Sequence, residues 1–215
     1  NAYQEFLEFL EKWPIPCVTG WNSNDLLWDH HECYSGRPGT IGNRTGNFAV
    51  QFSRCVLVVG CRLNIRQISY NWKAFAREAW TCQVDIDAAE LNKPTLQTDL
   101  KVHADAKGFF PLLSNTLEKI IIQKKIKTDK VLAHWQKWRN WLKQSLHEFP
   151  VSRDSLPSVS GVVNPYRLVR ELSNLLPEES VTVCSDGTAC VVGFQSAIFK
   201  KGQRMFHNSG CASMG

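Results

Sequence analysis

The sequence lacks a long hydrophobic run. No stretch approaches the roughly 20 apolar residues that a membrane-spanning helix requires, and the longest apolar run, CVLVVGC, has the length of a buried strand. The chain also opens without the basic and apolar segments of a secretory signal peptide. We therefore expect a protein that neither crosses nor binds a membrane.

The eight cysteines include no C-x-x-C pair. Several lie in apolar, strand-like runs, where cysteine behaves as a small hydrophobic residue, and this usage favours a reducing compartment, the cytoplasm. The stretch DHHEC, from Asp29 to Cys33, has no standard zinc-ligand spacing. We weigh a metal site against a polar loop there and expect the loop, and we assign no metal ligand elsewhere in the chain.

Basic residues are unevenly distributed within a formal net charge of +5. Lysine and arginine gather between Lys119 and Lys143, which is the pattern of a surface for nucleic acid or of a solvated helix face. Val131, Trp135, Trp138 and Leu142 follow the spacing of a buried helical stripe. We therefore expect a docked helix with a basic outer face and no nucleic-acid partner.

Strands and helices alternate along the chain, which predicts an α/β fold with a parallel sheet. Strands are expected in IPCVTG, RCVLVVGCRL, TCQVDI and LKVHA, and a helix in NWKAFAREA. We predict a Rossmann-like domain over residues 3–115, a basic helix and a Ser/Pro-rich linker over 116–163, and a second, incomplete α/β unit over 164–215. Asp87 and Asn164 are expected to cap helices.

Neither a G-x-G-x-x-G nor a Walker motif occurs, yet glycine, arginine and acidic residues follow the predicted strands. Because ligands of open parallel sheets bind at the carboxyl ends of the strands, this pattern indicates a nucleotide site. The alternative is that the glycines form turns and the arginines form surface ion pairs. The candidate nucleotide-binding residues are Gly39, Gly42, Gly60, Arg62, Asn64, Arg66, Asp85 and Asp105.

The run from IPCVTG to QISYNW, followed by VDIDAAELNKPTLQTDLKVHADAK, resembles the central domain of thiamine-diphosphate-dependent enzymes of the acetolactate-synthase-like group. The later run VCSDGTACVVGFQSAIFKKGQRMFHNSGCASMG resembles the start of their diphosphate-binding domain. The resemblance implies a six-stranded Rossmann-like central domain of the deoxyhypusine-synthase-like type, which in this family holds FAD, ADP or no ligand. It places Gly60 and Arg62 on the family's G-x-R motif, whose following acidic pair is Asn64-Ile65 here.

The same resemblance implies which residues face thiamine diphosphate. It places Gly187, Thr188 and Ala189 against the diphosphate and Met214 at the position that bends the cofactor. The magnesium motif of the family is absent from this chain, and so is the pyrimidine-binding domain. We therefore expect this chain to be an inactive part of an enzyme with thiamine diphosphate and Mg²⁺.

The activity implied is decarboxylation of a 2-oxo acid, pyruvate or a related compound, with transfer of the acyl-equivalent unit to an acceptor. The family also implies a homodimer or homotetramer. A scaffold module that binds a nucleotide or acyl-CoA without catalysis is the alternative that the residues leave open.

Overall fold

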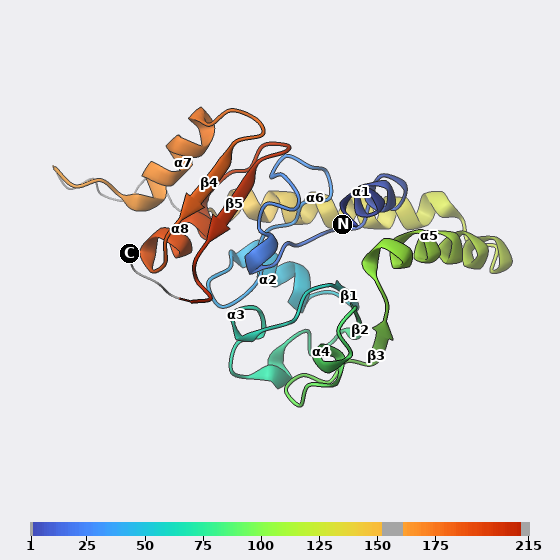
Figure 1. Cartoon of the computed structure of the whole chain (residues 1–215). Coiled ribbons are helices and arrows are strands. Elements are labelled where there is room, and N and C mark those ends of the chain that lie inside the picture. The colour runs from blue at the N-terminus through green and yellow to red at the C-terminus, as the bar shows by residue number, and fades with distance from the viewer. Residues whose placement is uncertain (1, 152–160, 212–215) are drawn as a thin grey trace.

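The computed structural model describes residues 2–151 and 161–211. Its first part contains a parallel three-stranded sheet in the order β1 (Cys55–Val59), β2 (Trp80–Asp85) and β3 (Leu100–His103). Val59 lies opposite Val84, and Asp85 lies opposite His103, so the strands end at a common edge. The predicted α/β class with a parallel sheet is confirmed (Figure 1).

Short helices precede and connect the strands of this sheet. η1 (Trp21–Ser23) and α2 (Arg44–Gln51) precede β1, α3 (Ile65–Ile68) and η2 (Trp72–Ala74) lie between β1 and β2, and α4 (Ala88–Asn92) lies between β2 and β3. The Asp87 carboxylate accepts a hydrogen bond from the Ala89 amide, which confirms Asp87 as the N-cap of α4.

Three longer helices cover one side of the first part: α1 (Tyr3–Lys12), α5 (Ala106–Gln123) and α6 (Thr128–Glu148). The Phe110 ring lies 5.6 Å from that of Phe6, and Trp13 meets Trp135 edge-on at 6.4 Å. Burial of such aromatic surface is the main source of stability here. The basic segment is therefore docked through its apolar face, as the stripe predicts.

The second part is a βαβ unit preceded by a helix. It comprises α7 (Pro165–Leu175), β4 (Val181–Cys184), α8 (Thr188–Ser196) and β5 (Arg204–His207), with β4 and β5 parallel. Asn164 caps α7 by accepting from the Tyr166 amide at 2.9 Å, as predicted. The outer face of this unit is apolar, because the side chains of Leu172 and Val183 are 49% and 77% exposed.

Three details of the predicted secondary structure are wrong. The run NWKAFAREA forms only η2, since Ser69 and Ala76, on either side of η2, have positive φ values of 63° and 46° and interrupt helical geometry. The strand expected in IPCVTG is reduced to a single bridge between Cys17 and Tyr34. The basic segment is not one helix, because Lys125, with φ 51°, separates α5 from α6.

Among the described residues, no helix combines the length and the apolar character needed to cross a bilayer. The eight cysteines are all free. Burial raises the pKa of the Cys17 and Cys33 thiols to about 12, so both stay protonated at neutral pH and act as packing groups.

Candidate functional site

The carboxyl edge of the three-stranded sheet brings together three of the predicted nucleotide-binding residues. Gly60 follows β1 and donates its amide to Val84 O at 2.9 Å, Asp85 ends β2, and Asp105 follows β3. Gly60 has φ +58°, and a Cβ built on it would meet no atom within 4 Å. A ligand can therefore approach the backbone closely at this point, which is the usual role of such a glycine.

The two carboxylates at this edge already serve the protein backbone. Asp85 is only 7% exposed, and its Oδ1 accepts from the Asp87 amide at 2.9 Å. Asp105 caps α5 by accepting from the Lys107 amide at 2.8 Å. Each carboxylate keeps lone pairs for a further donor, so a role toward ribose hydroxyls stays a prediction.

Arg62 forms a surface ion pair in this structure. Its Nε donates to Glu90 Oε1 at 2.7 Å while 73% of its side chain is exposed. Hydrogen bonds from Arg62 and Lys93 lower the pKa of the Glu90 carboxyl. The guanidinium is thus exposed to solvent but forms an ion pair with Glu90. This pair matches the alternative considered above, in which the arginines form surface ion pairs. The role of Arg62 toward a phosphate stays a prediction.

The glycine-rich loop between residues 36 and 46 folds tightly onto the protein itself. A Cβ on Gly39, whose φ is +127°, would lie 2.6 Å from Arg66 O, and a Cβ on Gly42 would lie 2.3 Å from Arg37 O. These glycines are required for contacts within the chain. Of the predicted nucleotide-binding glycines, only Gly60 could carry a Cβ that meets no atom within 4 Å.

Asn64 immediately precedes α3, and Arg66 lies within it. Asn64 caps α3 through its Oδ1, which accepts from the Arg66 amide at 3.0 Å. The Arg66 guanidinium lies 5.4 Å from the ring centroid of Trp21. A cation over an indole face is a stabilising arrangement, so Arg66 is held by Trp21.

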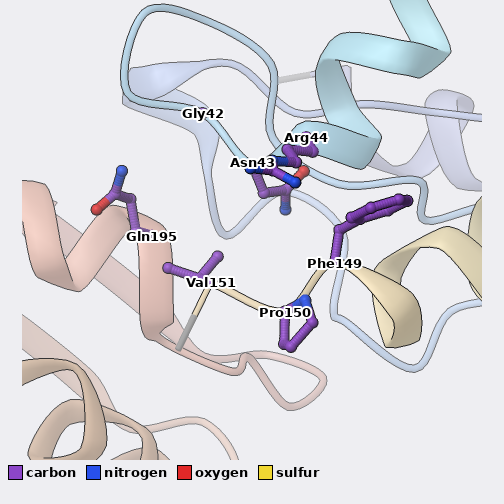
Figure 2. Close-up of a pocket in the computed structure, with 7 residues that line it drawn as sticks. All are labelled: Gly42, Asn43, Arg44, Phe149, Pro150, Val151 and Gln195. Carbon is purple, nitrogen blue, oxygen red and sulfur yellow. The ribbon is translucent and has the colours of Figure 1, made fainter. Parts of the chain in front are cut away.

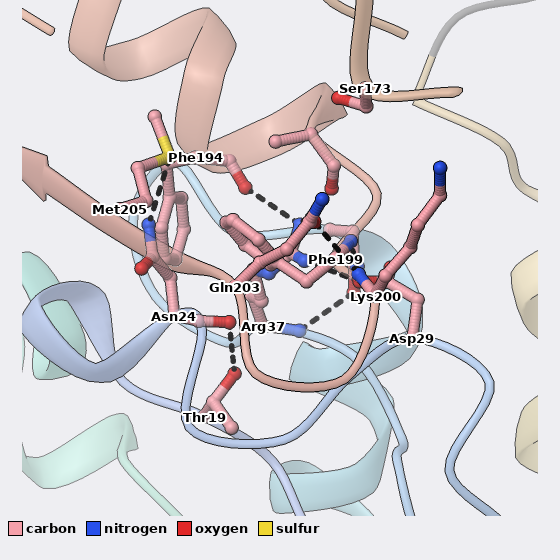
Figure 3. A network of polar contacts seen from close by, with 12 residues as sticks. Thr19, Asn24, Asp29, Arg37, Ser173, Phe194, Phe199, Lys200, Gln203 and Met205 are labelled. Carbon is pink, nitrogen blue, oxygen red and sulfur yellow. Dashed lines mark hydrogen bonds and ion pairs between the residues drawn. The ribbon is translucent and has the colours of Figure 1, made fainter. Parts of the chain in front are cut away.

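The strongest polar contact between the two parts involves a residue that sequence reasoning did not select. Arg37 is 2% exposed and donates to the carbonyls of Phe194 and Ala197, both at 3.0 Å, and to Asp29 Oδ2 at 2.9 Å (Figure 3). Burial lowers the pKa of Arg37, but Asp29, Tyr34 and Asp25 together raise it by more, so the side chain stays charged. No local motif signals such a residue, because its two carbonyl partners lie more than 150 positions away.

Asp25 makes a second contact between the parts. Its Oδ2 accepts from Arg204 Nε at 2.9 Å and from the Met205 amide at 2.8 Å. The unit over 161–211 is therefore tied to the central domain. The stretch DHHEC has protein partners as well, since Asp29 pairs with Arg37 and Glu32 with Arg139. No cluster of His, Cys, Asp or Glu suited to a metal occurs in residues 2–151 and 161–211.

The residues predicted to face thiamine diphosphate lie where β4 passes into α8. Gly187 has φ +64°, and a Cβ on it would meet nothing within 4 Å. Thr188 and Ala189 begin α8 and are exposed, so the first amides of the helix are accessible. Open space and helix N-terminal donors suit a diphosphate group, so these residues fit the cofactor. Met214 lies outside the described residues.

A pocket of about 240 Å³ lies between the central domain and the second part (Figure 2). The loop before α2, the segment after α6 and Gln195 of α8 line it, and Gln195 Nε2 donates to Ile41 O at 2.8 Å. Another pocket, of about 330 Å³, lies beside Gly39 and α3. Gly39 and Gly42 are the candidate binding residues that line these pockets.

These features define an α/β protein with parallel sheets, in which glycine turns beyond the ends of two strands adjoin open space. The family model "Thiamine pyrophosphate enzyme, central domain" matches residues 1–115. The chain belongs to the thiamine pyrophosphate enzyme family, as the resemblance predicts.

Relatives named as acetolactate synthases match most of the chain. A probable acetolactate synthase large subunit of Methanococcus aeolicus is 28% identical over 84% of this chain and 29% of its own length. Acetolactate synthase large subunits of Corynebacterium glutamicum and Lactococcus lactis are 25% and 23% identical, over 100% and 98% of this chain and 32% and 34% of their own lengths. The chain thus spans about a third of the relatives it matches.

Proposed function

We propose that this chain is part of an acetolactate-synthase-like enzyme that uses thiamine diphosphate and Mg²⁺. The substrate we propose is a 2-oxo acid, pyruvate or a related compound, and the acyl-equivalent unit left after decarboxylation is transferred to an acceptor. The names of the relatives support this reading. We also propose a homodimer or homotetramer in the cytoplasm, and no activity for residues 1–215 alone.

The observation that carries the proposal is the open turn at Gly187. Its positive φ, the empty space above it and the exposed start of α8 make a place for the diphosphate group. Thiamine diphosphate supplies an electron sink for the loss of carbon dioxide from a 2-oxo acid. The residues of this chain would bind and orient the diphosphate through the amides that follow Gly187.

The central domain is proposed to hold ADP, FAD or no ligand, with Gly60, Asp85 and Asp105 at the strand ends as the residues that would face one. Gly60 and Gly187 both have a positive φ, +58° and +64°, and both adjoin open space. An alanine substitution at either glycine therefore introduces backbone strain without a steric clash. The two variants form a matched pair that separates the two candidate sites.

The test uses the complete gene product. We expect it to release carbon dioxide from pyruvate only with thiamine diphosphate and Mg²⁺ present. Gly187→Ala should weaken thiamine diphosphate binding while Gly60→Ala leaves it unchanged, and ADP or FAD binding should show the reverse pattern. A protein that does not bind thiamine diphosphate overturns the proposed function. A shift in melting temperature with acyl-CoA or ADP alone would instead support the scaffold alternative.

A further inference from the structure

Trp21 lies at the centre of a buried cluster that joins the two parts of the chain. Trp21 is 5% exposed, and its ring centroid lies 4.4 Å from that of Phe194 in α8. Cys190 packs in the same cluster, and the Arg66 guanidinium lies over the indole. A residue held by so many neighbours keeps a fixed orientation.

Two residues are hydrogen-bonded to this fixed tryptophan: His207, the last residue of β5, and Ser209, in the turn that follows. The Trp21 indole Nε1 donates to Ser209 Oγ, and Ser209 Oγ lies 3.0 Å from His207 Nδ1. His207 Nε2 lies 2.9 Å from Trp21 O. We name this closed set of contacts among Trp21, His207 and Ser209 the Trp21 anchor.

The donors and acceptors of the Trp21 anchor fit only one arrangement of protons in a neutral imidazole. A carbonyl oxygen can only accept, so His207 Nε2 carries the hydrogen that it donates to Trp21 O. His207 Nδ1 then accepts from the Ser209 hydroxyl, whose oxygen accepts from the indole. The Ser209 hydroxyl both accepts and donates, and each other polar group is used once, so the cycle depends on these three side chains and on the Trp21 backbone carbonyl.

The segment held by the Trp21 anchor has few other attachments. Asn208, Gly210 and Cys211 are exposed, and a Cβ on Gly210 would meet nothing within 4 Å. A glycine-containing segment of this kind needs outside contacts to hold one conformation. Trp21 supplies them from the central domain, 188 positions earlier in the chain.

We propose that Trp21 is a positioning residue for thiamine diphosphate, acting through Ser209 and His207 on the turn after β5. This inference rests on the proposed function, which places the diphosphate at Gly187, after β4. The turn after β5 lies at the same edge of the sheet, because β4 and β5 are parallel and Cys184 pairs with His207. The anchor makes the central domain a part of the cofactor site without any direct contact with the cofactor. Weakening it should therefore lower cofactor affinity.

The test measures the Kd of thiamine diphosphate, with Mg²⁺, by calorimetry on the complete gene product. Trp21→Phe keeps an aromatic ring but removes the donor, Ser209→Ala removes the shared hydroxyl, and Ser209→Thr retains it. We expect the first two variants to raise Kd roughly three- to tenfold, the effect of losing one hydrogen bond, and Ser209→Thr to bind nearly as the wild type does. The matched control is Trp72→Phe, which alters a tryptophan of η2 that is outside the anchor.

Unfolding is followed for each variant in the absence of cofactor, so that affinity and stability are read separately. An unchanged Kd in Trp21→Phe and Ser209→Ala overturns the inference, whatever their melting temperatures. An equal rise in Kd for Trp72→Phe also overturns it. If the wild type itself fails to bind thiamine diphosphate, the proposed function has failed first, and the two failures are thereby distinguished.

Discussion

Asp29 and Phe199 are joined by two hydrogen bonds, one from the Asp29 backbone amide and one to the Asp29 side chain. The Asp29 amide donates to Phe199 O at 3.1 Å, and Asp29 Oδ2 accepts from the Phe199 amide at 2.8 Å. The same carboxylate oxygen accepts from Arg37, so one carboxylate joins the central domain to the unit over 161–211.

Removal of the buried Arg37 guanidinium should show how much this junction contributes to the free energy of unfolding. Arg37→Met leaves two carbonyl groups without their donor and removes the cation paired with Asp29, and we expect the free energy of unfolding to fall by about 3–5 kcal/mol. Arg62→Met breaks the exposed pair with Glu90 and should have a much smaller effect. Urea denaturation of both variants measures the difference, and equal costs would contradict the assignment.

Two glycines that face close neighbours should respond differently to alanine. A Cβ on Gly42 meets backbone atoms of Arg37, Pro38 and Gly39 at 2.3–2.7 Å, so Gly42→Ala should cost about 1–3 kcal/mol. A Cβ on Gly193 meets the flexible end of Met205, and alanine gains helix propensity there, so Gly193→Ala should be close to neutral. Thermal unfolding tests this order, and the reverse order would refute it.

The Asp99 carboxylate should make the stability of the folded protein depend on pH in the acidic range. Its Oδ2 accepts from the Thr81 hydroxyl and amide, both at 2.7 Å, and these hydrogen bonds lower the pKa of Asp99. A lowered carboxyl pKa contributes stability above the unfolded value of about 3.9, and that contribution is lost as pH falls below it. The wild type should therefore exceed Asp99→Asn in melting temperature at pH 7 and approach it near pH 3.

A conservative change at the donor provides the control for this pH dependence. Thr81→Ser keeps the hydroxyl and should retain the wild-type pH profile. Parallel profiles of the wild type and Asp99→Asn from pH 7 to pH 3 would show that the Thr81 hydrogen bonds do not favour the charged carboxylate.

The apolar outer face of the second unit should promote self-association of the 215-residue chain. Val183 is 77% exposed on β4 and Leu172 is 49% exposed on α7. Exposed apolar patches and open sheet edges are common sites of aggregation. Val183→Lys with Leu172→Lys should shift the chain toward the monomer in light scattering, whereas Lys119→Ala on the basic segment should not.

The sequence predicted the elements whose signals are local. The apolar run of β1 and the caps Asp87 and Asn164 have the expected structure, because strand burial and N-capping depend on neighbouring residues. The helix expected over 71–79 failed because Ser69 and Ala76 adopt positive φ, which no residue type there signals.

The same distinction between local and long-range signals applies to the candidate site residues. Gly60 was selected because it follows a strand, Gly187 was selected through the family resemblance, and both are open turns. Arg37 and Trp21 were not selected, because their importance comes from partners 157 and 188 positions away. Contacts at such separations leave no periodic pattern in a single sequence.

These long separations also bear on the order in which the chain acquires its structure. Residues near Trp21 and Arg37 leave the ribosome long before α8 and β5 exist, and closing so large a loop is entropically costly. We expect the junction to form last, so that Arg37 in a nascent chain lacks its two carbonyl partners until synthesis passes Phe199. Pulse-labelled amide exchange during refolding should then show protection of the Phe199 amide later than that of β2.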